Sequence, residues 1–138
     1  MVNTTEKMEI SELLNKSSYA LDERKIELLG DCFAKDAVMS LRISGEDLIG
    51  PFDGHEEIMK LMKDSMDTQT DQRRHVISNL FFEKEDEEVV TVVSYLTLFA
   101  TENKEINLLT TGIYRDEVVK VDGEWKINNR HLDLELPY

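Results

Sequence analysis

The chain contains little cysteine, proline or glycine, and it has no long apolar run. Its 138 residues include 1 Cys, 2 Pro and 6 Gly. The lone Cys32 excludes an internal disulfide and favours a reducing, cytoplasmic location. Because no segment is rich in proline, glycine or a repeated residue, no linker is expected. Residues 1–138 are therefore expected to form one domain.

Several classes of partner are disfavoured by what is missing. No stretch approaches the ~20 apolar residues of a transmembrane helix, and the opening MVNTTEKMEI has no apolar signal core, so no membrane role is expected. Basic residues are also scarce, since 16 Lys and Arg stand against 29 Asp and Glu, giving a net charge of −13. A phosphate backbone would be repelled, so no nucleic-acid partner is expected.

Short motifs of metal and cofactor sites are absent. The chain has no CxxC, HExxH, P-loop, GxGxxG or GxSxG pattern. Its histidines, His55, His75 and His131, are dispersed without the spacing of a local metal site. We therefore expect no metal and no organic cofactor.

What the chain does have is helical periodicity in its first half, which predicts three helices between residues 6 and 67. One helix face is formed by Ile10, Leu13, Leu14, Ser17 and Leu21. A short second helix is expected to carry Ile26, Leu29 and Phe33, with Asp22 and Glu23 near its start. A third stripe, after His55, consists of Ile58, Leu61, Met62 and Met66.

Strands are expected over residues 36–43 and, after Thr70, throughout the second half. GPFDG (50–54) has the composition of a turn. Four segments are rich in β-branched and aromatic residues, namely 73–83, 89–101, 106–121 and 124–135. Asp122-Gly123 between the last two is a hairpin signal. This order predicts an α+β fold with helices on one face of a curved sheet, a cone whose mouth suits a small ligand.

The segment RRHVISN (73–79) contains the strongest candidate for a catalytic residue, His75. In a strand of period two, His75 shares a face with Ile77, Asn79 and Phe81. Such a histidine is either a structural residue of an edge strand or core, or a general base aimed into a cavity. Asp22 is a candidate partner for the ring, although an N-cap of the second helix explains it equally well.

Other candidates have structural explanations of similar weight. Tyr19 lies one helical turn before Asp22, and Tyr95 and Tyr114 lie on expected strands. Core or rim packing explains tyrosines in such places, and a surface charge explains Arg130. Met62 is expected in the core of the third helix, although methionines also line adaptable pockets.

Four segments together resemble a known family. They are YALDERKIELLGDCFAKDAV (19–38), GHEEI (54–58), RRHVISNL (73–80) and GIYRDEVVKVDGEWKINNR (112–130). In this order they resemble the SnoaL-like branch of the nuclear transport factor 2-like superfamily, which includes scytalone dehydratase and hexachlorocyclohexane dehydrochlorinase. The resemblance covers nearly the whole chain. It implies a cone-shaped α+β barrel, with helices on a strongly bent, mixed and mainly antiparallel sheet.

The resemblance also assigns residues. Catalytic members pair an aspartate with a histidine, and Asp22 and His75 fall on those positions. The dehydrochlorinase has an arginine five residues after the tryptophan of its DGxW motif, which corresponds to Arg130. Where scytalone dehydratase has a second histidine, this chain has Phe99, and a lysine of the dehydrochlorinase is replaced by serine. Neither activity is therefore transferred as it stands.

Residues and resemblance together favour a cofactor-free acid–base enzyme of dehydratase, isomerase or cyclase type, acting on a small, largely apolar molecule in an enclosed pocket. His75 would be the base, and Asp22 would fix its tautomer. Arg130, with Tyr19 or Tyr114, would stabilise developing negative charge. The expected substrate-binding residues are Tyr19, Tyr95, Phe99, Tyr114 and Met62. The alternative is a non-catalytic module that binds a small ligand or a protein; in either case the family implies a homodimer formed through the sheet.

Overall fold

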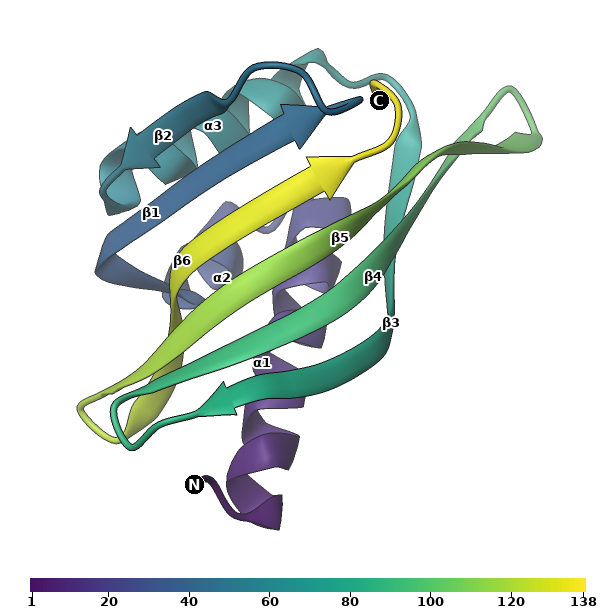
Figure 1. Cartoon of the computed structure of the whole chain (residues 1–138). Coiled ribbons are helices and arrows are strands. Elements are labelled where there is room, and N and C mark those ends of the chain that lie inside the picture. Colours follow the sequence, from purple (N-terminus) through teal and green to yellow (C-terminus); the bar gives the residue numbers. More distant parts are fainter.

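Three helices lie on one face of a six-stranded sheet (Figure 1). This computed structural model describes residues 1–138. The elements are α1 (Thr4–Asp22), α2 (Ile26–Asp31), β1 (Phe33–Ile43), β2 (Ile49–Asp53), α3 (His55–Thr68), β3 (Gln72–Glu85), β4 (Val89–Glu102), β5 (Glu105–Val121) and β6 (Glu124–Leu134). None of the helices is long and apolar enough to cross a membrane.

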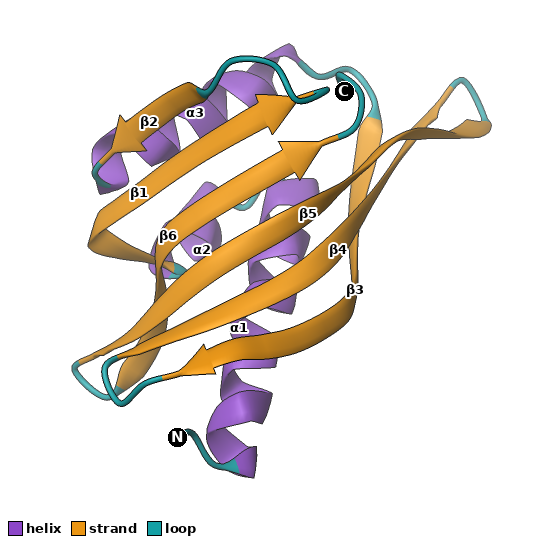
Figure 2. Cartoon of the chain, viewed as in Figure 1, coloured by secondary structure: helices purple, strands orange, loops and turns teal.

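The sheet is mixed and strongly curved. Its strands lie in the order β2-β1-β6-β5-β4-β3, in which only β1 and β6 are parallel. Figure 2 shows the long strands β3 to β6 bending across the helices, with α1 behind β4 and β5 and with α3 behind β1 and β2. The edges β2 and β3 remain unpaired to each other, so the cone is open on one side. The predicted α+β class and its curved, mainly antiparallel sheet are confirmed.

Apolar residues on the inner face of the sheet form two buried clusters. The larger one, of 18 residues, joins Ile10 and Leu14 of α1 to Ile58 of α3 and Val92 of β4. The smaller one, near the other end of the sheet, consists of Leu41, Leu96, Leu98, Tyr114, Leu132 and Leu134. Alternation along each strand sends every second side chain inward, and the smaller cluster leaves a space beside it that is described below.

The structure corrects the expected second helix. Phe33 is the first residue of β1, because α2 ends at Asp31 and the strand begins three residues earlier than predicted. Asp22 ends α1 and does not cap α2, whose N-cap residue is Lys25 with no side-chain hydrogen bond. The structural explanation of Asp22 as an N-cap is therefore wrong.

Two strand predictions also change. GPFDG was expected as a turn, yet residues 49–53 form the short edge strand β2, where Pro51 is tolerated because one side of an edge strand needs no ladder donor. Within β3, Asn79 has a positive φ of 53° and the pairing with β4 shifts there. This shift turns Phe81 outward, to 52% exposure, so Phe81 does not share the inner face with His75.

Candidate functional site

The candidate site begins where the end of α1 meets the start of β3. Gln72 Nε2 donates a hydrogen bond of 2.8 Å to the backbone carbonyl of Asp22. Arg24 Nη2 donates a 2.7 Å hydrogen bond to the backbone carbonyl of Asp71. Arg24 itself has a φ of 55°, a left-handed conformation that stops the helix. These contacts fix the last residue of α1 against the strand.

Asp22 holds both the backbone and the ring of His75. Its Oδ2 accepts a hydrogen bond from the His75 backbone N–H at 2.8 Å, and its Oδ1 lies 2.5 Å from His75 Nδ1. Asp22 is buried, and the His75 side chain is only 13% exposed. Two residues that are 53 positions apart in sequence are thus in direct contact.

The contact determines which nitrogen of the ring is free. An ionised carboxylate only accepts hydrogen bonds, so the proton of the neutral ring lies on Nδ1. Nε2 then carries the lone pair, and the protein offers it no hydrogen-bond partner. A ring that is oriented in this way can accept a proton from a molecule placed beside Nε2.

His75 borders a small, mainly apolar cavity between the inner face of the sheet and α3. The cavity has a volume of about 70 Å³, and 11 of its 16 lining residues are hydrophobic. The hydrophobic ones are Leu21, Met39, Leu41, Leu61, Met62, Leu96, Leu98, Tyr114, Leu132, Leu134 and Tyr138. Asp22 does not line this cavity, because it contacts His75 from the side of α1.

Arg130 reaches the cavity with its charge already paired. Its Nε and Nη2 donate to the two carboxylate oxygens of Asp116 at 2.7 and 3.1 Å, and both residues are buried. The guanidinium also lies 4.3 Å from the centre of the Tyr114 ring. Burial is the largest single effect on the pKa of Arg130 and acts to lower it, but the Asp116 carboxylate together with Tyr114 and Cys32 raises the pKa above its ordinary value.

Tyr114 is the tyrosine that the structure places in the cavity. It is 3% exposed, and its hydroxyl has no hydrogen-bond partner in the protein. Burial raises the pKa of Tyr114 to about 12, against the opposing effect of the Arg130 guanidinium. Its hydroxyl therefore stays protonated at neutral pH and can donate a hydrogen bond into the cavity.

Arg73 is a cavity residue that the sequence reasoning did not single out. Its side chain is 12% exposed and lines the cavity, with Nε donating to Asp71 Oδ1 at 2.8 Å. The neighbouring Arg74 points outward and pairs with Glu23. Strand alternation was the available signal, since it puts Arg73, and not Arg74, on the same face as His75.

The predicted site residues thus fall into two groups. His75, Arg130, Tyr114 and Met62 line one cavity, and Asp22 contacts His75 from behind. Three others do not line this cavity: Tyr19 and Tyr95 are 51% and 49% exposed, and Phe99 is also absent from its lining. Tyr19 instead lines a surface hollow that Asp22 and His75 also border. In β4 the alternation turns Leu96 and Leu98 inward, which leaves Tyr95 and Phe99 on the outer face. Tyr19 is on the outer side of α1, beneath the Lys25 ammonium.

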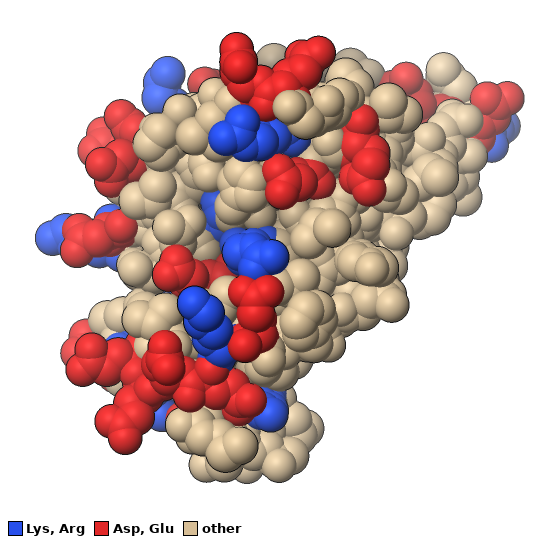
Figure 3. Space-filling view, in the orientation of Figure 1, with Lys and Arg blue, Asp and Glu red and all other residues tan.

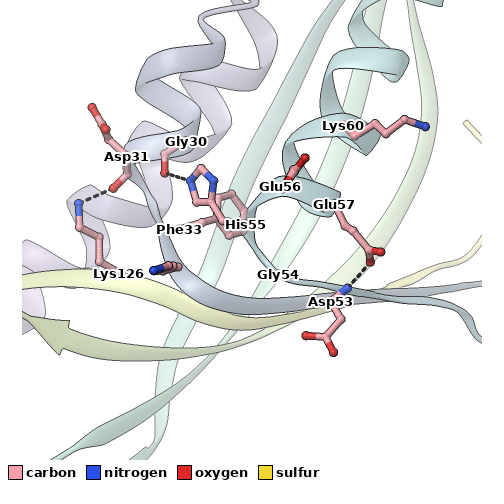
Figure 4. Close-up of a pocket in the computed structure, with 11 residues that line it drawn as sticks. Gly30, Asp31, Phe33, Asp53, Gly54, His55, Glu56, Glu57, Lys60 and Lys126 are labelled. Atoms are coloured by element: carbon pink, nitrogen blue, oxygen red, sulfur yellow. Dashed lines mark hydrogen bonds between the residues drawn. The ribbon is translucent and has the colours of Figure 1, made fainter.

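A larger hollow lies between the end of α2 and the start of α3 (Figure 4). Its volume is about 920 Å³, but Phe33 is the only hydrophobic residue among the 11 that line it. His55 lies there, with Nε2 2.8 Å from the backbone carbonyl of Gly30. Small-molecule sites bury their ligands against apolar side chains, and this open, charged hollow offers few. The smaller cavity at His75 is therefore the candidate site.

The side chains of this structure form no metal site, and the one thiol is not an activated nucleophile. No three His, Cys, Asp or Glu side chains converge. Cys32 is a buried free thiol whose pKa is raised by burial, which disfavours the reactive thiolate. His131 does contact Ser40 Oγ at 2.8 Å and Asp133 Oδ1 at 2.9 Å, but Asp133 is exposed and the three lie outside the cavity.

The sequence and the fold place the chain in a family. The family model described as "SnoaL-like domain" matches residues 3–131. The chain therefore belongs to the SnoaL-like domain family, as its segments predicted. No curated protein matches it in sequence.

Solved structures with the same fold include proteins of several kinds. A Nostoc punctiforme protein of unknown function, with a cystatin-like fold, is 25% identical, with a TM-score of 0.81 over 99% of this chain and 97% of that one. A Catenulispora acidiphila protein in complex with S-DNPA is 23% identical, with a TM-score of 0.82 and 96% of each chain covered. The beta subunit of a candidate aromatic-ring-hydroxylating dioxygenase from Novosphingobium aromaticivorans is 15% identical, with a TM-score of 0.83 and coverage of 97% of this chain and 92% of that one.

Proposed function

We propose that this member of the SnoaL-like family is a cofactor-free acid–base enzyme of dehydratase, isomerase or cyclase type. Its substrate is a small, largely apolar molecule that binds in the cavity beside His75. The observation that carries the proposal is the 2.5 Å contact between Asp22 Oδ1 and His75 Nδ1, which leaves Nε2 without a partner in the protein on a histidine that lines an apolar cavity. A similar fold holds S-DNPA in the Catenulispora acidiphila structure, which supports binding of a small molecule within this fold.

In the proposed reaction His75 removes a proton from carbon. Nε2 accepts the proton, and the resulting imidazolium is stabilised by the Asp22 carboxylate that already holds Nδ1. Negative charge then develops on an oxygen of the substrate, where the Tyr114 hydroxyl donates a hydrogen bond. From this enolate, a β-hydroxyl group that takes the proton back from the His75 imidazolium leaves as water, which gives dehydration. Return of the same proton to a different carbon gives isomerisation. Attack of the enolate carbon on a second carbonyl of the substrate, with the proton passing to the new alkoxide, gives ring closure.

The size of the cavity limits what can bind. Its volume of about 70 Å³ is well below the roughly 300–1,000 Å³ of pockets for drug-sized ligands. The substrate is therefore small, and its entry requires movement of flexible lining side chains. Met62 on α3 is suited to such movement because its unbranched thioether adapts to different shapes. Tyr138 also lines the cavity and is half exposed, so it stands at the boundary with solvent.

Exchange of carbon-bound hydrogen for deuterium tests the proposal without a known substrate. Purified protein is incubated in D2O with small carbon acids such as 1-indanone and 2-cyclohexenone, and proton NMR follows loss of the α-proton signal. We expect accelerated exchange of at least one compound, reduced about 10²–10⁴-fold in His75→Ala. His55→Ala is the matched control, since it removes a histidine from the open hollow and should leave exchange unchanged.

Equal exchange in wild type and His75→Ala would contradict the catalytic role. If the compounds nevertheless bound in the cavity, the result would favour the alternative, a non-catalytic ligand-binding module. Titration of isotopically labelled protein with the same compounds separates the two outcomes. A compound that binds without reacting shifts the NMR signals of cavity residues while its own α-proton signal persists.

We also propose that the protein forms a homodimer through the outer face of its sheet. In Figure 3 charged side chains crowd the left and centre of this face, including the lower-left ends of the long strands, whereas the right-hand part, over the middle of β4 and β3, carries few. Exposed apolar side chains of that area include Val76, Tyr95 and Ile113, and the last two are direct neighbours on paired strands. Light scattering should give twice the chain mass for wild type and the monomer mass for Tyr95→Glu; a monomeric wild type would contradict the dimer.

A further inference from the structure

The charges that line the His75 cavity differ in sign from those of the whole protein. The chain has a net charge of −13, with 29 aspartates and glutamates. None of these carboxylates lines the cavity, whose ionisable residues are Arg73, His75, Arg130 and two tyrosines. The carboxylates that pair with the three basic residues contact them from outside the cavity, and they are Asp71, Asp22 and Asp116. The cavity therefore presents hydrogen-bond donors and positive charge to whatever enters it.

The two arginines are not equally available. Arg130 uses two of its nitrogens in a bidentate pair with Asp116. Arg73 uses only Nε for Asp71, and its Nη1 is buried without any hydrogen-bond partner. A buried N–H of a charged group is unfavourable when it has no acceptor. In native proteins such a group is explained by an acceptor outside the protein, such as a water molecule, an ion or a ligand.

The position of Arg73 along the strand relates it to the base. Arg73 and His75 are two residues apart on one face of β3, which separates their Cα atoms by about 7 Å. That distance is comparable to the length of a small ring with one substituent. A molecule anchored at Arg73 would therefore extend to His75 Nε2 over the apolar surface of Leu96 and Leu98.

We propose that Arg73 anchors the ligand of this cavity and that the ligand is a small apolar molecule bearing a carboxylate. The guanidinium binds the carboxylate through charge-assisted hydrogen bonds, including one from Nη1. The apolar body then lies among the leucines and the Tyr114 ring, with one carbon next to His75. The inference rests on the proposed function for the location of the ligand, but it concerns binding and requires no turnover.

Two matched probes test the carboxylate. Benzoate and benzyl alcohol share the ring and differ in the charged group, and each is titrated into isotopically labelled full-length protein while NMR spectra are recorded. We expect wild type to bind benzoate at least tenfold more tightly than benzyl alcohol, with shifts at cavity residues. Arg73→Gln should remove this preference, and Arg74→Gln, which alters only the outward neighbour paired with Glu23, should keep it.

The proposal is overturned if wild type binds neither probe, binds both equally, or binds benzoate outside the cavity. It is equally overturned if Arg73→Gln keeps the full preference for benzoate. Should Arg73→Gln fail to fold, the Arg73 Nε–H signal of wild type decides, because it should shift with benzoate and stay unchanged with benzyl alcohol. Failure of deuterium exchange with intact benzoate binding would refute the catalytic proposal alone, and the converse result would refute only the anchor.

Discussion

Two histidines, His75 and His55, each have one ring nitrogen in contact with an oxygen. The two differ in the charge of that oxygen partner and in the cavity that they border. His75 contacts the Asp22 carboxylate and borders an apolar cavity of about 70 Å³. His55 contacts the neutral backbone carbonyl of Gly30 and borders an open hollow of about 920 Å³. A carboxylate stabilises the protonated ring far better than a carbonyl does, because it carries a full opposite charge.

The lining residues make the second difference. Four carboxylates and three lysines line the hollow, and they are Asp31, Asp53, Glu56, Glu57, Lys35, Lys60 and Lys126. No carboxylate lines the cavity. Charges that remain in water interact weakly, whereas charges and dipoles in a closed apolar space act strongly on a bound molecule. Volume alone would therefore select the charged hollow and not the apolar cavity as the candidate site.

The largest effect on activity is expected when His75, like His55, has only a neutral group as its hydrogen-bond partner. Asp22→Asn replaces the carboxylate by a neutral amide of the same shape, and the amide can also present its NH2 group and hold the wrong tautomer. We expect kcat for deuterium exchange to fall roughly 10²-fold or more, with a smaller change in KM. Unchanged kcat would show that the carboxylate has no part in the reaction.

A second test compares the ion pairs of the two regions. Asp116→Ala leaves the buried Arg130 charge without its partner and should lower the free energy of unfolding by about 3–5 kcal/mol. Lys60→Ala removes a pair with Asp64 whose side chains are 81% and 67% exposed, and it should change stability by less than ~1 kcal/mol. Urea unfolding measures both variants. A similar loss in the free energy of unfolding of the two variants would show that burial does not determine how much each ion pair contributes to stability.

The smallest expected effect is a dependence on alkaline pH that comes from Tyr114. Burial raises its pKa in the folded protein to about 12, above the ordinary tyrosine pKa of about 10. Between these values the unfolded chain loses a proton that the folded chain keeps, so stability is fully present below the unfolded pKa and falls as pH rises toward 12. The expected slope from this one group is about 1.4 kcal/mol per pH unit.

The control for this slope is Tyr114→Phe, which lacks the hydroxyl. Its unfolding in urea, measured at several pH values from neutral to strongly alkaline, should have a shallower alkaline slope than wild type. Equal slopes in the two proteins would mean that Tyr114 titrates alike in the folded and unfolded chains, and that the cavity does not exclude water from its hydroxyl.

Much of the fold could be predicted because local chemistry dictates it. The stripe of Ile10, Leu14 and Ser17 defined the buried face of α1, and Asp122-Gly123 marked the β5–β6 turn, where both residues have positive φ. The strand β2 could not be predicted, because its pairing with β1 overrides the turn composition of GPFDG. The alternation beyond His75 was misjudged for a related reason, since the shift at Asn79 arises from pairing between β3 and β4.

The sequence by itself determined the class of the fold, the acidic surface and the candidacy of His75, because periodicity, charge and residue type are local properties. The residues alone left Asp22 with two explanations, an N-cap or a partner for the His75 ring, and resemblance to a family favoured the partner. Only the tertiary structure decided which candidate residues line one cavity. Tyr114 lines it, Tyr95 and Phe99 lie on the outer face of the sheet, and Arg73 lines it although the sequence had not indicated it. The tertiary structure also decided that Arg130 is occupied by Asp116 while Arg73 has an unpaired N–H. The physical reason is that availability of a charge depends on which partners distant strands bring within hydrogen-bond distance, and no local pattern records those partners.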